Sequence, residues 1–246
     1  MKDPKNELRE YLNKLIRRLL FIKGLNKQLN LLKEWETPRR VIALETGSYF
    51  FKLVEFSFYR TILIELCMFF NEREDKGLID WLNKAKEHAK ILRPSIYNDE
   101  TEKREILKPE TYQKIISGQQ ELINSKKEII SNIKGRRDTS LTHSDAKYFN
   151  TPEDTYVTFP LTNNDIDSII EIATQILRMQ HIYLFKSDLD IQVHATSNVD
   201  TILRHTRAFK RVWNDKRAKP LYPYLYKLDD YEEKLKEHLD KKSVNA

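Results

Sequence analysis

The sequence predicts an all-α protein, built as a helical bundle with a C-terminal helical extension. Two observations lead to this fold class. Glycine and proline are scarce, with 5 and 8 among 246 residues, and this composition disfavours a β-sandwich or barrel. Apolar residues also recur at helical spacing over long segments that are joined by short connections. We assign the bundle to residues 1–186 and the extension to residues 187–246.

Proline marks the first two helix starts. Asp3-Pro4 and Thr37-Pro38 each place a capping residue before a proline, which suits the first position of a helix. The first helix is expected to reach Glu34, with a bend at Gly24. The second is expected to carry residues 41–70 and to be central, because it is apolar on most sides.

A single apolar stripe and a proline define the next elements. The stripe predicts a third helix over residues 76–92, ended by Arg93-Pro94. Residues 94–108 are predicted as a polar, charged loop. A fourth helix is expected to begin at Pro109 and to be interrupted at Gly135.

The C-terminal half continues the helical pattern. Residues 156–159 are the one stretch expected to be locally extended. Thr162 and Asp165 have the spacing of a capping box, and a fifth helix with a regular apolar period follows them. A sixth helix is predicted over residues 199–214, and a weaker seventh over residues 230–239.

Several classes of site are disfavoured by the sequence. It contains no phosphate-binding glycine loop, no HExxH, no CxxC and no GxSxG. No two of its six histidines have a spacing typical of metal ligands, so neither a metal nor a cofactor is predicted. The single cysteine, Cys67, lies in an apolar run and is interpreted as a small core residue.

The charge is unevenly distributed, which bears on the choice of partner. Residues 1–40 hold 11 Lys or Arg against 5 Asp or Glu, residues 202–220 hold 7 against 1, and the rest of the chain is net −6. Two basic zones on an acidic body favour a polyanion such as RNA. Three arginines share one helix face in the second zone and are candidate RNA contacts: Arg204, Arg207 and Arg211. The alternative is that these are ordinary basic helix faces.

The location expected from the sequence is the cytoplasm. The first ten residues are charged and lack the apolar core of a secretory signal. The most apolar run, residues 49–70, contains four charged side chains, which would be costly in a bilayer. No membrane partner is therefore predicted.

One polar stretch, residues 134–149, combines groups suited to phosphate chemistry. Arginine donates paired hydrogen bonds to phosphate oxygens, and histidine acts as a general acid or base near neutral pH. Arg136 and Arg137 precede His143 by seven and six residues. In a straight helix Arg136 would share a face with His143, about 10 Å away along the axis, and it is a candidate nucleic-acid contact. The alternative is a polar connector with no catalytic role.

A twofold dimer would help such a site to cleave RNA. Attack of a ribose 2′-hydroxyl on the adjacent phosphorus needs one group to accept a proton and another to donate one. Two copies of His143, one from each subunit across a twofold axis, would supply both groups.

The same stretch resembles the signature of HEPN domains. In that signature an arginine, often followed by a polar residue, precedes a histidine by a few positions; Arg137, Asp138 and His143 occupy these places, followed by Ser144 and Asp145. The form of the motif is similar to the AbiU-like branch, which is linked to abortive phage infection. The resemblance extends over about residues 31–184.

This resemblance implies a fold, an activity and partners. The family fold is an up-and-down helical bundle, often dimeric, and many members are metal-independent endoribonucleases that act as toxins or antiviral effectors. By resemblance, Arg137 would hold the scissile phosphate, His143 would be the acid or base, and Asp138 would orient the pair. RNA, a second copy of the chain, and an antitoxin or other defence-system protein are the implied partners. The alternative is a non-catalytic scaffold or a nucleic-acid-binding module.

Overall fold

The computed structural model describes residues 3–33, 38–72, 75–98, 101–142, 152–193 and 198–214. These ranges are mostly helical, as the sequence predicts. They fall into two units. Unit 1 contains residues 3–30 and 54–193, and unit 2 contains residues 31–53 and 198–214. Residues 31–53 thus belong with the C-terminal unit, whereas the boundary drawn from the sequence places them in the bundle.

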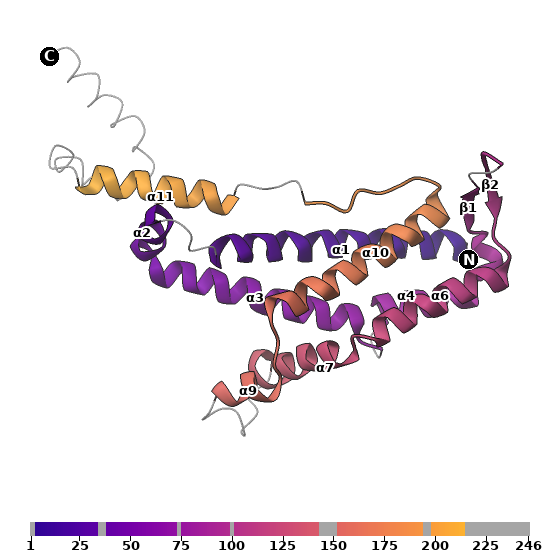
Figure 1. The fold of residues 1–246 in the computed structure, drawn as a ribbon, viewed down its shortest axis with the longest axis horizontal. Helices are drawn as coiled ribbons and strands as arrows, with labels where there is room; N and C mark the ends of the chain where they lie inside the picture. Colours follow the sequence, from indigo (N-terminus) through magenta and orange to yellow (C-terminus); the bar gives the residue numbers. More distant parts are fainter. Residues whose placement is uncertain are drawn as a thin grey trace, which may run out of the picture. The chain divides into compact units, whose positions relative to one another are not determined.

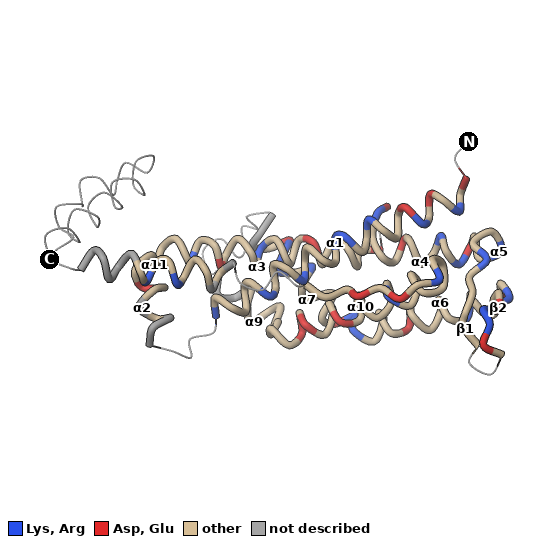
Figure 2. Tube along the Cα trace, turned by 90° about the horizontal axis from the view of Figure 1, so that it is seen from above, with Lys and Arg blue, Asp and Glu red and all other residues tan. Residues whose placement is uncertain are grey.

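Helix α1, Pro4–Lys33, forms one long side of unit 1. Its apolar residues recur every three or four positions and are buried: Leu8, Leu12, Leu15, Ile16, Leu19, Ile22 and Leu29. Basic and acidic residues interleave along its other faces (Figure 2). The helix runs through Gly24 without interruption, so the glycine does not end it.

Helices α3 and α10 run alongside α1 in unit 1 (Figure 1). Arg18 of α1 pairs with Glu65 of α3, and Asn26 donates to Asp167 of α10 at 2.6 Å. Helix α3 spans Ser48–Phe70 and is separated from α2, Pro38–Thr46, by a turn at Gly47. The single helix predicted over residues 41–70 is therefore two helices.

Helix α4, Leu78–Glu87, packs onto the first turns of α1. The buried indole of Trp81 donates to the carbonyl oxygen of Leu8 at 2.9 Å. The predicted third helix is divided at His88, after which the short α5 spans Ala89–Leu92. Burial of a single apolar stripe stabilises both α4 and α5. The buried residues of this stripe are Leu78, Leu82, Ala85, Ala89 and Leu92.

The predicted loop over residues 94–108 is instead a β-hairpin. Strands β1, Ser95–Asn98, and β2, Lys103–Ile106, pair antiparallel with Ser95 opposite Ile106. Arg104 anchors the hairpin by donating to the carbonyls of Ile182 and Lys186 at the end of α10. An isolated two-stranded hairpin has only marginal stability in water. This hairpin depends on a contact with a distant helix, so its own charged sequence does not predict it.

The fourth predicted helix is also divided in two. Helix α6, Pro109–Asn124, begins at the predicted proline, and α7, Lys127–Arg136, follows after a turn at Ser125 and Lys126. The interruption expected at Gly135 is wrong, because that residue lies inside α7. Helix α6 is tied to α10 through a buried hydrogen bond from the Tyr112 hydroxyl to the Gln180 side chain, at 2.5 Å.

The stretch predicted as extended, residues 156–159, lies largely in a short helix. Helix α9 spans Pro152–Thr158, and its start is explained by Pro152 at the first helical position. Helix α10, Asn163–Phe185, then buries a regular apolar stripe against α1 and α6. Its predicted capping box is confirmed: the amide of Asp165 donates to the Thr162 hydroxyl oxygen, and the Asp165 carboxylate accepts from the amide of Thr162.

The substitution Asp165→Asn is expected to destabilise unit 1 by about 0.5–1 kcal/mol at pH 7. Hydrogen bonds from the hydroxyl and the amide of Thr162 hold the pKa of Asp165 below its usual range. A carboxyl with a lowered native pKa stabilises the fold above its unfolded pKa, and this contribution is lost as the pH falls through the native value. Denaturant unfolding of both proteins should therefore differ at pH 7 and converge at acidic pH; a constant difference would contradict this reading.

Within unit 2, helix α2 packs against α11, Asn198–Asn214. Ala43 and Leu44 of α2 and Val199 and Leu203 of α11 are buried. The sixth helix predicted over residues 199–214 is thus confirmed, and the predicted seventh lies outside the described residues. None of the helices in the described ranges has the length and apolarity needed to cross a membrane.

Candidate functional site

The candidate catalytic motif begins where α7 changes its helical form. Arg136 ends α7, and residues Arg137–Thr142 continue as a π-helix, η1. Such wide turns are rare, and they occur frequently at functional sites because they shift side chains out of the regular helical register. His143 follows η1 in the sequence and lies outside the described residues.

Arg137 and Asp138 form an ion pair on η1. The Nε and Nη2 atoms of Arg137 lie 2.8 and 2.6 Å from the same carboxylate oxygen, Oδ1 of Asp138. The Arg137 side chain is 17% exposed and that of Asp138 is 41% exposed. The carboxylate of Asp138 thus orients a partly buried guanidinium.

Arg136 has a different environment from its neighbour. Its side chain is 6% exposed, and its guanidinium donates to the carbonyls of Phe159 and Leu161 and to the hydroxyl of Tyr59. The guanidinium carbon also lies 4.8 Å from the ring centroid of Tyr156. Because these contacts use the donors inside the protein, Arg136 presents little surface to a nucleic acid, and the structure favours a packing role over the contact predicted from the sequence.

The close approach of α7 to the segment after α9 requires a glycine. A Cβ atom on Gly135 would lie 2.3 Å from Cδ1 of Phe159, far inside van der Waals contact. The hydroxyl of Thr139 donates to the Gly135 carbonyl at 2.7 Å and joins η1 to the end of α7. Gly135 and Arg136 therefore hold the start of the motif against Phe159.

The substitution Gly135→Ala is expected to destabilise unit 1 by about 1–3 kcal/mol, because the added methyl group overpacks the contact with Phe159. Gly118→Ala is the matched control: a Cβ there meets no atom within 4 Å in the middle of α6. That change should stabilise the protein by about 0.4–1 kcal/mol through the higher helix propensity of alanine. Denaturant unfolding measures both, and equal effects of the two substitutions would contradict the packing argument.

The predicted RNA-contacting arginines lie on α11 in unit 2. Arg204 is exposed and Arg207 is partly buried, and both lie on a helix whose Val199 and Leu203 face the core. Arg211 is in the same helix, but its side chain is outside the described part. In the sequence, residues 31–53 and 197–246 together hold 16 Lys or Arg against 11 Asp or Glu, which is +5 of the net +6 of the chain.

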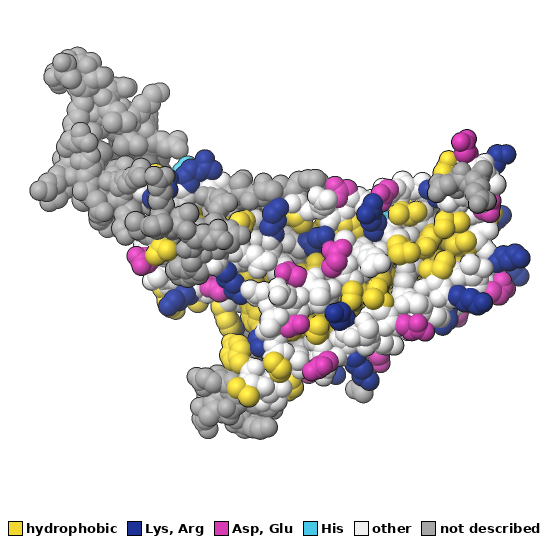
Figure 3. All heavy atoms as spheres, in the orientation of Figure 1, with side chains coloured by type: hydrophobic (Ala, Val, Ile, Leu, Met, Phe, Trp, Pro, Cys, Tyr) yellow, Lys and Arg dark blue, Asp and Glu magenta, His cyan; other side chains and the backbone are white. Residues whose placement is uncertain are grey.

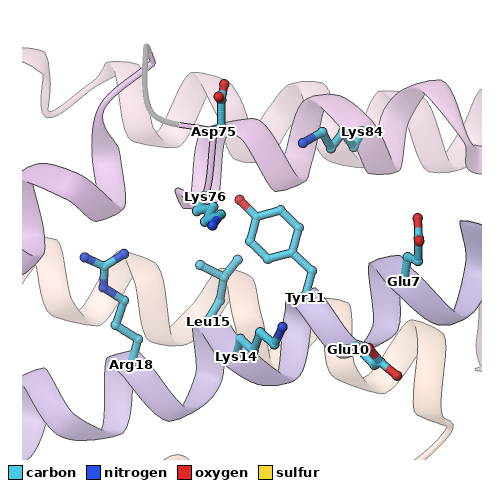
Figure 4. A pocket seen from close by; sticks show the side chains of 9 residues that line it. All are labelled: Glu7, Glu10, Tyr11, Lys14, Leu15, Arg18, Asp75, Lys76 and Lys84. Atoms are coloured by element: carbon cyan, nitrogen blue, oxygen red, sulfur yellow. The ribbon is translucent and has the colours of Figure 1, made fainter.

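A charged pocket of about 460 Å³ lies in unit 1 between α1 and the start of α4 (Figure 4). The sequence does not predict this pocket, because its walls come from residues some sixty positions apart that carry no recognised motif. It is lined by Glu7, Glu10, Tyr11, Lys14, Leu15, Arg18, Asp75, Lys76 and Lys84. By contrast, no three His, Cys, Asp or Glu side chains gather as metal ligands within the described ranges.

No protein-family model, curated protein or solved structure matches the chain.

Proposed function

We propose that the protein is a metal-independent endoribonuclease of the HEPN type, acting as a dimer and serving as a toxin or phage-defence effector. The observation that carries the proposal is the Arg137–Asp138 ion pair on a π-helix that immediately precedes His143 in the sequence. It is supported by the mostly helical fold and by the motif in the sequence.

The proposed reaction is transesterification within the RNA chain. One His143 accepts the proton of a ribose 2′-hydroxyl, whose oxygen attacks the adjacent phosphorus. Arg137, oriented by Asp138, donates to the phosphate oxygens as negative charge develops on them. A protonated His143 from the second subunit gives its proton to the departing 5′-oxygen. The products are a 2′,3′-cyclic phosphate and a 5′-hydroxyl end, and no metal takes part.

The products and the metal requirement test this function directly. Pure full-length protein is incubated with mixed RNA in excess chelator, and the new ends are identified. Cleavage that leaves 2′,3′-cyclic phosphate and 5′-hydroxyl ends is the expected result. Absence of cleavage, or cleavage that requires a divalent metal ion and leaves 5′-phosphate ends, would reject the proposal.

The second candidate function is a nucleic-acid-binding module without catalysis. It is favoured by the positive charge of residues 31–53 and 197–246, since the other residues, 1–30 and 54–196, are nearly neutral, with 27 Lys or Arg against 26 Asp or Glu. On the face of the bundle seen in Figure 3, acidic and basic side chains are intermixed. This function predicts RNA binding that weakens steeply with salt, survives replacement of His143 and falls when Arg204 and Arg207 are replaced. Binding that does not change with ionic strength would remove its basis.

A further inference from the structure

The pocket in unit 1 has three walls. The first is one face of α1, where Glu7, Glu10, Lys14 and Arg18 recur every three or four residues, with Tyr11 and Leu15 between them. The second wall is the turn that precedes α4, and the third is α4 itself, which contributes Lys84. A volume of about 460 Å³ is in the range of sites for small organic ligands.

Two side chains of the pocket are held in place by the protein. The hydroxyl of Tyr11 lies 2.8 Å from the carbonyl oxygen of Gly77 and 3.0 Å from Oδ2 of Asp80. Burial, and then the neighbouring Asp80 carboxylate, raise the pKa of Tyr11, so the phenol stays protonated as a donor. Arg18 pairs with Glu65 through Nε, and its Nη2 lies 3.3 Å from the Met68 sulfur. Both groups are therefore positioned before a ligand arrives.

Two lysines of the pocket have no partner among the residues that the structure describes. Lys14 and Lys76 are exposed, and neither makes a hydrogen bond or an ion pair with any residue that the structure describes. In the view of Figure 4, Lys76 and the Tyr11 hydroxyl both lie between α1 and the turn before α4, with Arg18 on the same side; the acidic Asp75 also lies next to Lys76. Unpaired ammonium groups beside a fixed guanidinium form a site for a phosphate group, which accepts several charge-assisted hydrogen bonds.

On the α1 wall of the pocket, the end opposite Arg18 is acidic; Lys84 of α4 lies at the same end and is paired with Asp80. Glu7 and Glu10 lie on the other side of Tyr11 from Arg18 (Figure 4). Glu10 and Lys14 have the spacing of a helical ion pair, yet no such pair forms. The carboxylates of Glu7 and Glu10 also lack partners within the described ranges. They are therefore available to accept hydrogen bonds from N–H groups of a ligand.

We propose that this pocket binds a nucleoside monophosphate, with the phosphate at Lys14, Lys76 and Arg18 and the base edge at Glu7 and Glu10. The separation of basic and acidic groups along one helix face matches a ligand that is anionic at one end and a hydrogen-bond donor at the other. Guanine offers two adjacent N–H donors to a carboxylate, whereas uracil offers one between two acceptor oxygens. GMP is therefore the expected preferred ligand and UMP the weakest. The site is independent of the proposed ribonuclease.

Isothermal titration of the full-length protein with GMP, UMP, guanosine and inorganic phosphate, in the presence of chelator, tests the proposal. GMP is expected to bind roughly tenfold more tightly than UMP, which corresponds to one additional hydrogen bond to a charged group. Guanosine and inorganic phosphate, each lacking half of the contacts, should bind more weakly than GMP. GMP binding that is absent at millimolar concentration, or no tighter than that of phosphate alone, would overturn the assignment.

Substitutions separate the two ends of the pocket. The double change Lys14→Met with Lys76→Met should weaken GMP binding by roughly a hundredfold, since each lysine supplies one charged hydrogen bond. Lys114→Met, at an exposed position of α6 outside the pocket, is the matched control and should leave binding unchanged. Glu7→Gln with Glu10→Gln should remove most of the preference for GMP over UMP. The proposal would be contradicted if the double lysine variant and the Lys114→Met control lost GMP affinity equally. It would also be contradicted if the double glutamine variant kept its full preference for GMP over UMP. Both results are independent of the RNA-cleavage assay.

Discussion

Replacing His143 with alanine is expected to abolish RNA cleavage while leaving the helical bundle folded. A positioned acid or base accelerates such reactions by about 10²–10⁴-fold, and in the proposed dimer the substitution removes both the acid and the base. Arg137→Ala should lower the cleavage rate by about 10²–10³-fold, because in the proposed reaction it removes the donor to the phosphate oxygens on which negative charge develops. Asp138→Asn should have a smaller effect, since it weakens the orientation of Arg137 without removing the guanidinium.

The measurement is the single-turnover cleavage rate of each variant over a range of pH, with circular dichroism to verify the fold. The wild-type rate should follow a bell-shaped pH profile, as expected when one group must be deprotonated and another protonated. His205→Ala serves as a matched control, because His205 is an exposed histidine in unit 2. Undiminished cleavage by the His143 variant, or an equal loss in the His205 variant, would contradict the assigned role.

The second large effect is expected from Arg136→Met, which should destabilise unit 1 by about 2–4 kcal/mol. The guanidinium of Arg136 is buried and donates to two carbonyls and a hydroxyl, and methionine fills similar space without supplying any donor. Arg136→Lys should recover only part of the loss, because a single ammonium group cannot reproduce the forked geometry. Denaturant unfolding monitored by circular dichroism gives the free energies.

Lys134→Met is the matched control for Arg136, since it removes a positive charge from an exposed position on the same helix. The Lys134→Met variant is expected to unfold at the same denaturant concentration as the wild-type protein. An unchanged midpoint for Arg136→Met as well would show that the buried contacts of this arginine contribute nothing to stability. It would also restore Arg136 as a candidate nucleic-acid contact.

Local signals in the sequence determine the helical class and most helix starts of this protein. The prolines at positions 4, 38 and 109 begin helices, and the Thr162–Asp165 capping box forms as its spacing predicts. Cys67 is a buried side chain of the core, as its apolar neighbours indicate. Each of these features depends on residues that are a few positions apart in the sequence. The sequence therefore predicts them without knowledge of the tertiary structure.

Contacts between distant segments decide the remaining features. The hairpin over residues 95–106 depends on Arg104 reaching the end of α10, about eighty residues away in the chain. Arg136 and Arg137 are adjacent and chemically equal in the sequence. The first nevertheless bonds to residues 23, 25 and 77 positions away, while the second pairs with its neighbour Asp138.

The charged pocket has the same origin, since Lys14 and Lys76 line one cavity only after α1 and the turn before α4 pack together. Periodicity and capping involve a turn or two of helix, whereas burial of a particular side chain depends on which segments meet. The helices of this protein therefore follow from its sequence pattern, and the roles of individual charged residues follow from its tertiary packing.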